Sequence, residues 1–430
     1  MTKQVNIAIL GFGTVGSGVY QVLTEGKESI KHRELVNIDV RRILVRDLVT
    51  ERNIGLAPIE TFATDFADII NDPEISIVVE CMGGTVPAKD YILGALAAGK
   101  TVVTSNKEVL AKHWPEFERQ AKATGAGLYF EATAGGGVPI IRTLLDSMQG
   151  NNITHLMGIV NGTTNYILTK MADEGRPYAE VLAEAQKLGY AEANPSADVD
   201  GWDSVYKLSI LASIAFHARV NIDDIYREGI SLVSAEDIAV AKKLGYTIKL
   251  LAIGKKMNNN LEVRVHPTML HNSHPLANVS GVFNGIFLTG DAVDDIMLYG
   301  RGAGKLPTAS AIVSDIIYAS NVAEHRYMTF VNEFDAPQWL VHQKDWLSGY
   351  FIRLTASDEL GSLSKIAGVL GDSGVSVHSV MQFNENAHKN TAELVFITDT
   401  ARELSVQSAL ARLRALSCVI SVDSVMRVEE

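Results

Sequence analysis

The chain has 430 residues, more than one hydrophobic core usually covers, so we expect several domains. Its composition, 47% hydrophobic and 20% charged residues, excludes a disordered chain. The formal net charge is -12 without any Lys/Arg-rich block, so nucleic acid is not an expected partner. The two cysteines form no C-x-x-C pair and no apolar stretch reaches about 18 residues, so we expect a soluble cytoplasmic protein without a membrane partner.

The first 133 residues alternate strand patterns with helix patterns, which is typical of an α/β domain built on a doubly wound parallel sheet. We expect strands at 5–10, 38–45, 75–80, 100–104 and 127–131, and helices at 86–98 and 107–124. A later helical pattern at 307–320, within 305–330, is compatible with a return to this domain.

A glycine-rich loop follows the first strand and opens a helix. Gly11, Gly13 and Gly16 form G-x-G-x-x-G, in which the glycines permit a tight turn, close approach of a pyrophosphate and close helix packing. We also expect the residues between these glycines to contact the cofactor: Phe12, Thr14 and Val15. This pattern favours a Rossmann-type dinucleotide site over a purely structural turn.

Further cofactor contacts are expected where other strands end. Arg46 and Asp47 follow the second strand; an acidic residue there suits a ribose hydroxyl and an arginine suits a 2′-phosphate, so NAD and NADP both remain open. Ordinary solvated loop charges are the alternative for Arg46 and Asp47. Gly83 and Lys107 follow the next two strands at the same edge of the sheet. A plain turn and a surface lysine are the alternatives for these two.

Two more regions follow. Residues 134–304 read as an α+β domain for catalysis and dimerisation, with strands expected at 153–160, 247–256, 261–267 and 282–299. Residues 331–349 read as a linker. Residues 350–430 have a βαββαβ order, the ferredoxin-like arrangement, with strands at 350–356, 375–383, 391–398 and 418–427 and helices at 361–372 and 402–415.

Charged residues crowd into 187–216. Asp203 and Lys207 have the i, i+4 spacing of one helix face, and Leu208, Leu211, Ala212 and Ala215 supply that helix with a buried stripe. Glu192 and Asp198 lie just upstream in a loop that contains a proline. Several carboxylates and one lysine suit an amino-acid substrate, although a solvated helix entry fits equally well.

Three histidines, His266, His271 and His274, lie close together in the sequence. Two prolines and the absence of a neighbouring cysteine or carboxylate cluster argue against three converging metal ligands. We therefore expect surface histidines.

Long motifs along the chain resemble the homoserine dehydrogenase family in the family's order: GFGTVG, VVTSNKEVLA, EATAGGGVPIIR, GIVNGTTNYILTKM, AEANPSADVDGWDSVYKLSILA and GRGAGKLPTASA. They span residues 5–320. Residues 350–430 resemble an ACT domain, a module that senses small molecules. There is no room for an aspartokinase domain, so the resemblance is to the monofunctional form.

The resemblance implies reversible reduction of L-aspartate 4-semialdehyde to L-homoserine by NAD(P)H, for threonine and methionine synthesis; Arg46 favours NADP. It implies that Lys207 is the proton donor and acceptor and that Lys107 lies beside nicotinamide and substrate. The substrate's amino group would be held, or the lysine ordered, by Glu192, Asp198 and Asp203. It further implies a site for a monovalent cation, with sodium expected, made by Glu131 and the carbonyls of Ala134, Gly136 and Val138. Gly302 and Gly304 match a loop that closes near the cofactor.

Two departures from the family pattern concern charge and regulation. Ala193-Asn194-Pro195 stands where the family usually has A-D-P, which removes one charge beside Glu192. The ACT motif lacks its usual proline between Asp358 and Gly361, the two residues expected to bind an effector. Threonine is the first effector to test; a purely subunit-holding role is the alternative.

The oligomeric state follows from the expected ACT sheet, whose second face should be bare. Ile352, Val377 and Val395 would then expose apolar surface unless another copy packs on it. The sequence therefore predicts a homodimer or a larger homo-oligomer.

Two other functions remain as alternatives. A dehydrogenase that forms an acyl phosphate would need a cysteine nucleophile, and neither Cys81 nor Cys418 is well placed. A catalytically dead sensor of nucleotide and amino acid is the other alternative, and the intact Lys107, Glu192, Asp203 and Lys207 argue against it.

Overall fold

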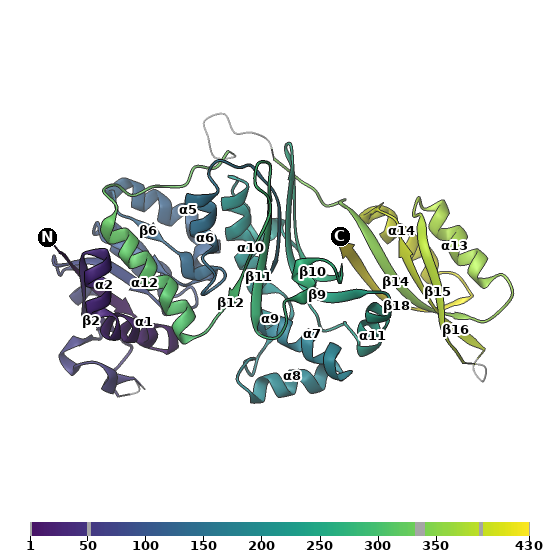
Figure 1. The fold of residues 1–430 in the computed structure, drawn as a ribbon, viewed down its shortest axis with the longest axis horizontal. Coiled ribbons are helices and arrows are strands. Elements are labelled where there is room, and N and C mark those ends of the chain that lie inside the picture. Colours follow the sequence, from purple (N-terminus) through teal and green to yellow (C-terminus); the bar gives the residue numbers. More distant parts are fainter. Residues whose placement is uncertain (1, 50–52, 332–339, 387–389, 430) are drawn as a thin grey trace. The chain divides into compact units, whose positions relative to one another are not determined.

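The computed structural model describes residues 2–49, 53–331, 340–386 and 390–429 (Figure 1). The chain divides into two compact units. The first comprises Met1–Leu156, Val205–Ile225 and Phe283–Trp339, and the second comprises Met157–Ser204, Tyr226–Val282 and Leu340–Glu430.

The first unit contains a parallel sheet of six strands in the order β3-β2-β1-β4-β5-β6. The strands are β1 (Lys3–Leu10), β2 (Val36–Leu44), β3 (Phe62–Ala63), β4 (Ile75–Glu80), β5 (Thr101–Thr104) and β6 (Leu128–Tyr129). The chain order reverses between β1 and β4, which is the doubly wound arrangement. The predicted parallel sheet is confirmed, and β3 is an additional short edge strand.

Helices pack on this sheet: α1 (Thr14–Glu25), α2 (Lys27–Glu34), α3 (Ala67–Ile70), α4 (Ala88–Ala97), α5 (Lys107–Thr124) and α12 (Lys305–Asn321). Although α12 comes from far along the chain, it lies beside α1 (Figure 1). Its Ile312 and Ile316 share one buried cluster with Ile7 and Ile9 of β1. The segment predicted at 307–320 therefore contributes to the core of the dinucleotide-binding sheet.

The first unit also contains α6 (Ile140–Arg142), most of α10 (Trp202–Ala215) and the hairpin of β11 (Phe283–Gly290) and β12 (Asp294–Arg301). The single strand expected at 282–299 is wrong. A tight turn at 291–293 divides it, and Asp294 takes a left-handed conformation with φ 56°. The aspartates at this turn are typical turn residues.

The second unit holds α7 (Gly162–Glu174), α8 (Tyr178–Lys187), α9 (Ser196–Val199) and α11 (Ala235–Lys243). The strands predicted at 247–256 and 261–267 are confirmed as β9 (Tyr246–Met257) and β10 (Asn260–His271), which pair antiparallel around a tight turn where Asn258 has φ 54°. β7 (Ile153–Ile159) crosses the boundary between the two units.

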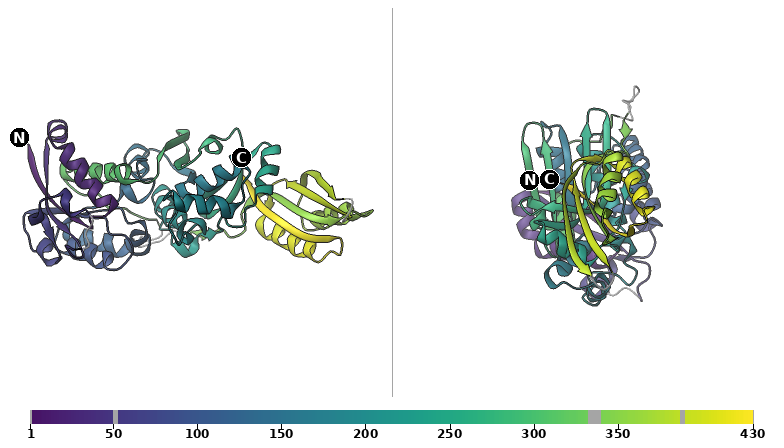
Figure 2. Two further views of the ribbon diagram at one scale, coloured as in Figure 1. Left: turned by 90° about the horizontal axis from the view of Figure 1, so that it is seen from below. Right: turned by 90° about the vertical axis from the view of Figure 1, so that its right-hand side faces the viewer.

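The C-terminal module has the predicted βαββαβ order. It consists of β14 (Leu347–Ser357), α13 (Ser362–Asp372), β15 (Val377–Asn386), β16 (Thr391–Thr398), α14 (Glu403–Arg414) and β18 (Val419–Glu429). Its four strands run antiparallel in the order β18-β14-β16-β15, and β18 also pairs with β10, with Thr268 opposite Arg427. The module is thus continuous with the sheet of the second unit (Figure 2).

The expectation of a bare sheet face in this module is wrong. Ile352 lies in the core under α13 and α14, Val377 packs against that core, and Val395 is fully buried. On the other face, Arg353 donates to Asp237 of α11 over 2.8 Å. The chain itself packs around Ile352, Val377 and Val395, so the argument from these residues to subunit pairing fails.

Much of the predicted linker, residues 332–339, lies outside the described residues. Its remaining part is structured: β13 (Val341–His342) pairs with β10, and Trp346 is buried against Tyr226 at a ring distance of 5.0 Å.

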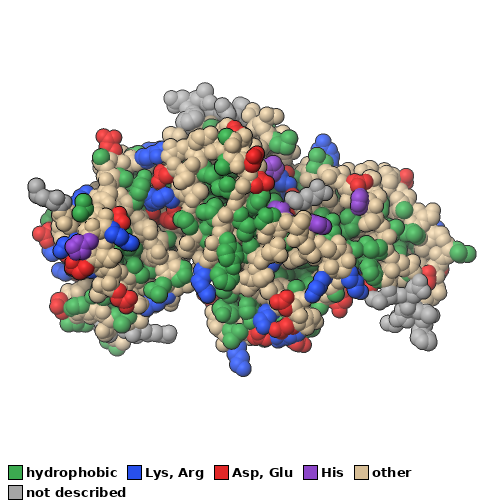
Figure 3. Space-filling view, in the orientation of Figure 1, with side chains coloured by type: hydrophobic (Ala, Val, Ile, Leu, Met, Phe, Trp, Pro, Cys, Tyr) green, Lys and Arg blue, Asp and Glu red, His purple; other side chains and the backbone are tan. Residues whose placement is uncertain are grey.

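Charges of both signs are interspersed on the face seen in Figure 3. Across the described part of the chain, no helix is both long and apolar enough to cross a membrane.

Candidate active site

The carboxyl ends of three adjacent strands meet at one edge of the parallel sheet. Gly11 follows β1, and the Cys81 amide after β4 donates to the Leu10 carbonyl over 2.9 Å. The Ser105 amide after β5 donates to the Glu80 carbonyl over 3.2 Å. Ligands of open α/β sheets bind at such an edge, where the strand order reverses.

The three glycines of the first loop have different surroundings. Gly11 has φ 90°, and a methyl group there would lie 3.1 Å from the Cys81 carbonyl oxygen. A methyl group at Gly16 would overlap the Gly11 carbonyl oxygen. At Gly13, by contrast, no atom of the described residues lies within 4 Å of the methyl position, apart from Gly13 itself and its chain neighbours. Gly11 and Gly16 therefore close the turn, while Gly13 leaves open space at the start of α1, where free N–H groups suit a phosphate.

Phe12 holds this loop from inside. Its ring is buried and packs edge-on against Tyr20 and Phe62, at 5.8 and 5.4 Å. Its carbonyl accepts a hydrogen bond from Asn53 over 2.7 Å. The Phe12 ring thus anchors the loop in the core, whereas Thr14 at the start of α1 is exposed.

The two residues after β2, Arg46 and Asp47, differ in exposure and in hydrogen bonding. Asp47 accepts a hydrogen bond from the Val49 amide over 2.9 Å and so stabilises its own loop. Arg46 is exposed.

A buried carboxylate, Glu80, was not foreseen from the sequence. It ends β4 with a fully buried side chain and accepts hydrogen bonds from the Thr104 hydroxyl at 2.6 Å, the Met82 amide at 2.8 Å and the Asn106 side chain at 3.5 Å. Burial raises its pKa, and these donors oppose the rise. Glu80 therefore connects the loop after β4 with the loop after β5.

Asn106 completes this connection. Its Nδ2 donates to the Gly84 carbonyl over 2.7 Å, and its Oδ1 caps α5 by accepting from the Val109 amide over 3.2 Å. Lys107 is the first residue of α5. The predicted cofactor residues Gly83 and Lys107 thus sit on two loops that share one hydrogen-bond network. An acidic residue that ends an otherwise apolar strand was the available sequence signal.

The loop that contains Gly304 reaches two neighbours. Gly304 has φ 125°, and a methyl group at Gly18 of α1 would lie 2.8 Å from the Lys305 carbonyl oxygen. The Gly137 amide donates to the Arg301 carbonyl over 2.9 Å. This loop therefore packs against the first helix of the dinucleotide fold and against the loop after Glu131.

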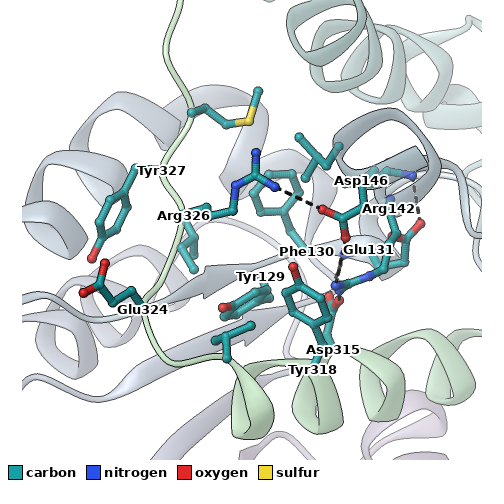
Figure 4. A pocket seen from close by; sticks show the side chains of 15 residues that line it. Tyr129, Phe130, Glu131, Arg142, Asp146, Asp315, Tyr318, Glu324, Arg326 and Tyr327 are labelled. Atoms are coloured by element: carbon teal, nitrogen blue, oxygen red, sulfur yellow. Dashed lines mark hydrogen bonds and ion pairs between the residues drawn. The ribbon is translucent and has the colours of Figure 1, made fainter. Parts of the chain in front are cut away.

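Glu131 sits in a buried charge cluster (Figure 4). Its carboxylate accepts from the Ile141 and Arg142 amides over 2.9 and 2.7 Å. Asp315 accepts from the Glu131 amide over 2.8 Å and from the Arg142 guanidinium over 2.5 Å. Burial, reinforced by their mutual repulsion, raises the pKa of Glu131 to about 7; burial raises that of Asp315 to about 6, against the lowering effect of Arg142.

This cluster has an excess of negative charge when both acids are ionised, because Arg142 faces both Glu131 and Asp315. The cluster lines a cavity of about 120 Å³ (Figure 4). Ala134 and Val138, predicted to offer carbonyl oxygens, are buried, and Gly136 has φ 55°. The donor types and the charge excess fit a monovalent cation. Asp315 was not foreseen because it is distant in sequence.

The second unit brings together two of the three predicted substrate carboxylates. Asn161 donates through Nδ2 to Asp198 over 2.7 Å and to Asp203 over 2.8 Å. Glu192 is exposed, and in the described ranges no hydrogen bond or ion pair of its carboxylate is found. Asn161 was missed because the sequence offers no spacing that links it to residues so far along the chain.

Lys207 is buried on α10, one turn after Asp203. The predicted apolar stripe of this helix is confirmed, since Leu208, Leu211 and Ala212 are fully buried. A buried lysine on a helix that also carries a buried aspartate is unusual for a solvated helix entry.

The prediction of surface histidines is wrong for His266 and His274, which are both buried, and it is confirmed for exposed His271. His266 accepts a hydrogen bond from Arg264 over 2.8 Å. Burial, together with the positive charge of Arg264, lowers its pKa well below the usual value. His274 caps a short turn through the Leu276 amide, and His271 contacts Ser273. Within the described residues, no group of three or more His, Cys, Asp or Glu side chains could hold a metal ion.

Two other predicted residues belong to the C-terminal module. Asp358 is exposed, and Gly361 has φ 87° directly before α13.

Cys81, which follows β4, is not suited to be a nucleophile. Burial raises the pKa of its thiol, which keeps the thiol protonated.

A doubly wound parallel sheet whose glycine loop opens α1 defines the class of dinucleotide-dependent oxidoreductases. Family models agree along the chain: "Homoserine dehydrogenase, NAD binding domain" matches residues 11–131, "Homoserine dehydrogenase" residues 139–317 and "ACT domain" residues 350–418.

Similar proteins cover the whole length. A homoserine dehydrogenase from Bacillus subtilis is 40% identical, with 99% of each chain covered. The crystal structure of one from Thiobacillus denitrificans has a TM-score of 0.91 at 37% identity, covering 100% of this chain and 99% of that one. A hyperthermophilic archaeal homoserine dehydrogenase in complex with NADPH has a TM-score of 0.64 at 29% identity, covering 75% of this chain and all of the other. The chain belongs to the homoserine dehydrogenase family and is an NAD(P)-dependent oxidoreductase with an ACT domain.

Proposed function

We propose that this enzyme works in the cytoplasm and interconverts L-aspartate 4-semialdehyde and L-homoserine on the route to threonine and methionine. The observation that carries the proposal is α10, which bears buried Lys207 one turn after buried Asp203. A buried ammonium suits proton transfer, and the carboxylates upstream suit the amino group of an amino-acid substrate.

The chemistry needs a hydride and a proton. When bound, the reduced nicotinamide supplies the hydride to the aldehyde carbon. The Lys207 ammonium donates the proton to the carbonyl oxygen as negative charge develops there, and takes it back in the reverse direction. Such acid–base assistance contributes roughly 10²–10⁴-fold in rate.

Other side chains hold the reactants. Asp198, Asp203 and Glu192 would attract the substrate ammonium, and Lys107 at the start of α5 would lie beside the nicotinamide and the substrate. The hydrogen bonds of Glu80 and Asn106 support this role, because they fix the loop that precedes Lys107.

The preferred cofactor is NADPH, and NADH is accepted. Exposed Arg46 is available for a 2′-phosphate, whereas Asp47 is engaged in its own loop. The archaeal relative in complex with NADPH supports the same preference.

A sodium ion is held by Glu131 and the carbonyls of Ala134, Gly136 and Val138. The two buried acids beside a single arginine support a monovalent rather than a divalent cation, because one positive charge balances the cluster. Its role is structural, since it fixes the loop between the parallel sheet and α6.

Regulation and assembly complete the proposal. The enzyme forms at least a homodimer through residues 134–304, the region expected from the sequence to serve dimerisation, rather than through the ACT sheet. Threonine binds beside Asp358 and Gly361, where the neighbouring Leu360 is fully exposed. Calorimetry with threonine and sedimentation of the full chain test both points; absence of heat and inhibition at millimolar threonine would exclude this effector.

The central test is NADPH oxidation with L-aspartate 4-semialdehyde. Lys207→Ala should lower kcat by roughly 10²–10⁴-fold with little change in cofactor binding. Lys107→Ala is the matched control, and near-normal kcat in Lys207→Ala would transfer the proton role to Lys107 or water. No turnover of the semialdehyde by the wild type would refute the proposed function.

A further inference from the structure

The amide of Asn161 joins two carboxylates that come from different elements of the second unit. We propose that Asn161 is a positioning residue, which holds Asp198 and Asp203 as a pair that selects substrates with an ammonium group. This inference rests on the proposed function.

The amide is oriented by contacts on both sides. Its Oδ1 accepts from the Thr164 amide over 2.9 Å and from the Thr164 hydroxyl over 3.0 Å. Its Nδ2 must then point the other way, where it donates to Asp198 over 2.7 Å and Asp203 over 2.8 Å. All the hydrogen-bonding groups of the side chain have partners in this one arrangement.

The bridge keeps two like charges close. One oxygen of each carboxylate accepts a hydrogen bond from the same nitrogen, Nδ2 of Asn161. The two carboxylates therefore cannot separate to relieve their repulsion without breaking a hydrogen bond. Asp203 and Asn161 are both buried, which weakens the screening of this repulsion by water. A pair of carboxylates held together in this way attracts a compact cation such as a primary ammonium group.

The scaffold around Asn161 is also rigid. The residue follows β7 and is the N-cap of α7, so a strand end and a helix start fix its backbone. Asp198 belongs to the short helix α9 and Asp203 to α10. Asn161 is therefore the common contact of three elements, and its loss should change the spacing of the pair before it changes the fold.

Two substitutions separate the bridge from the cap. Asn161→Ser and Asn161→Asp both retain a side-chain oxygen that can cap α7, but neither can donate to both carboxylates, and Asn161→Asp adds a third negative charge. Ser234→Ala is the control, because it removes the N-cap of α11, which has no part in the carboxylate pair.

The readout is selectivity between L-aspartate 4-semialdehyde and 4-oxobutanoate, the analogue without the amino group. In Asn161→Ser, kcat/KM for the amino substrate should fall roughly 10–100-fold, with much less change for the analogue and an unchanged KM for NADPH. In Asn161→Asp, kcat/KM should fall further with both substrates. Thermal unfolding of each variant checks that the fold is retained.

The possible results distinguish a positioning role of Asn161 from a purely structural one. Equal losses for both substrates in Asn161→Ser, or a selectivity ratio equal to that of the wild type, would overturn the positioning role. A wild type that does not turn over the semialdehyde would instead contradict the proposed function. A loss of selectivity in Ser234→Ala would show that helix capping alone explains the effect, and would also overturn the inference.

Discussion

The cofactor loops of the first unit and the carboxylate pair of the second are built in different ways. The cofactor loops are shaped by backbone: Gly11 and Gly16 close a turn whose geometry tolerates no side chain. The carboxylate pair is shaped by side chains, since the Asn161 amide donates hydrogen bonds to both Asp198 and Asp203. A short motif therefore suffices to predict the first site, whereas the second depends on contacts between residues far apart in the chain.

The two glycines Gly16 and Gly13 give the sharpest test of the backbone-shaped site. Gly16→Ala should prevent stable folding of the sheet, because its methyl group would overlap the Gly11 carbonyl; overpacking of this kind costs about 1–3 kcal/mol or more. Gly13→Ala should keep the wild-type unfolding temperature, since its methyl group meets no atom of the described residues beyond its chain neighbours. It should raise the KM for NADPH roughly tenfold or more, because the methyl group would occupy the space assigned to the pyrophosphate.

Thermal unfolding and cofactor titration of both variants check this contrast. Unchanged NADPH affinity in Gly13→Ala would contradict the assignment of the open space to the pyrophosphate. A stable, active Gly16→Ala would show that the loop can relax.

Glu80 shows that side-chain contacts also matter at the cofactor edge. Glu80→Gln should raise the KM for NADPH several-fold and lower the unfolding temperature, because an amide cannot accept from Thr104 and Met82 at the same time. Steady-state kinetics and calorimetry measure the two effects. Glu74→Gln, at an exposed carboxylate in the same unit, is the control. If Glu80→Gln matched the wild type, the network would have no role in placing the loops.

The sequence allowed the fold to be predicted well because the elements have strong local patterns. The strands of the parallel sheet and the βαββαβ module have clear boundaries, and the error at 282–299 arose from a turn without glycine at its centre. The elements that cover each face of the ACT sheet could not be predicted. The burial of Ile352 depends on α13 and α14, and on the other face Arg353 pairs with Asp237 of α11; no local pattern encodes this packing.

Site residues divide along the same line. The glycines, Lys107 and Lys207 stand in motifs, so the sequence alone could point to them as candidates. Glu80 and Asn161 make hydrogen bonds to partners more than twenty residues away, so no local spacing links either residue to those partners. The only signal in the sequence was the acidic residue at the end of an apolar strand, which pointed to Glu80 but not to its partners.

The residues after β2 test whether an exposed side chain can set cofactor choice. Arg46→Ala should lower the ratio of kcat/KM for NADPH to that for NADH by roughly tenfold, because a 2′-phosphate loses its charged partner. Arg41→Ala, which removes an arginine that pairs with Asp72 over 2.5 Å, is the control. An unchanged ratio in Arg46→Ala would leave the preference for NADPH without support.

The smallest expected effect concerns the cluster of Glu131 and Asp315, where backbone and side chains contribute together. In the folded state their pKa values are about 7 and about 6, above the usual values of 4.5 and 3.8. Folding is thus favoured most when both are protonated, and this contribution is lost as the pH rises through 6 to 7. A bound sodium ion favours the ionised forms, so it should offset the loss.

The wild type should therefore unfold a few degrees higher in sodium chloride than in choline chloride at pH 7.5, and the difference should shrink at pH 5, where Glu131 is protonated. In Glu131→Gln the difference should be absent at both values of pH, since the neutral amide has no charge to balance. Scanning calorimetry at matched ionic strength measures all four conditions. A salt difference that is independent of pH in the wild type, or that persists in Glu131→Gln, would place any sodium effect elsewhere in the molecule.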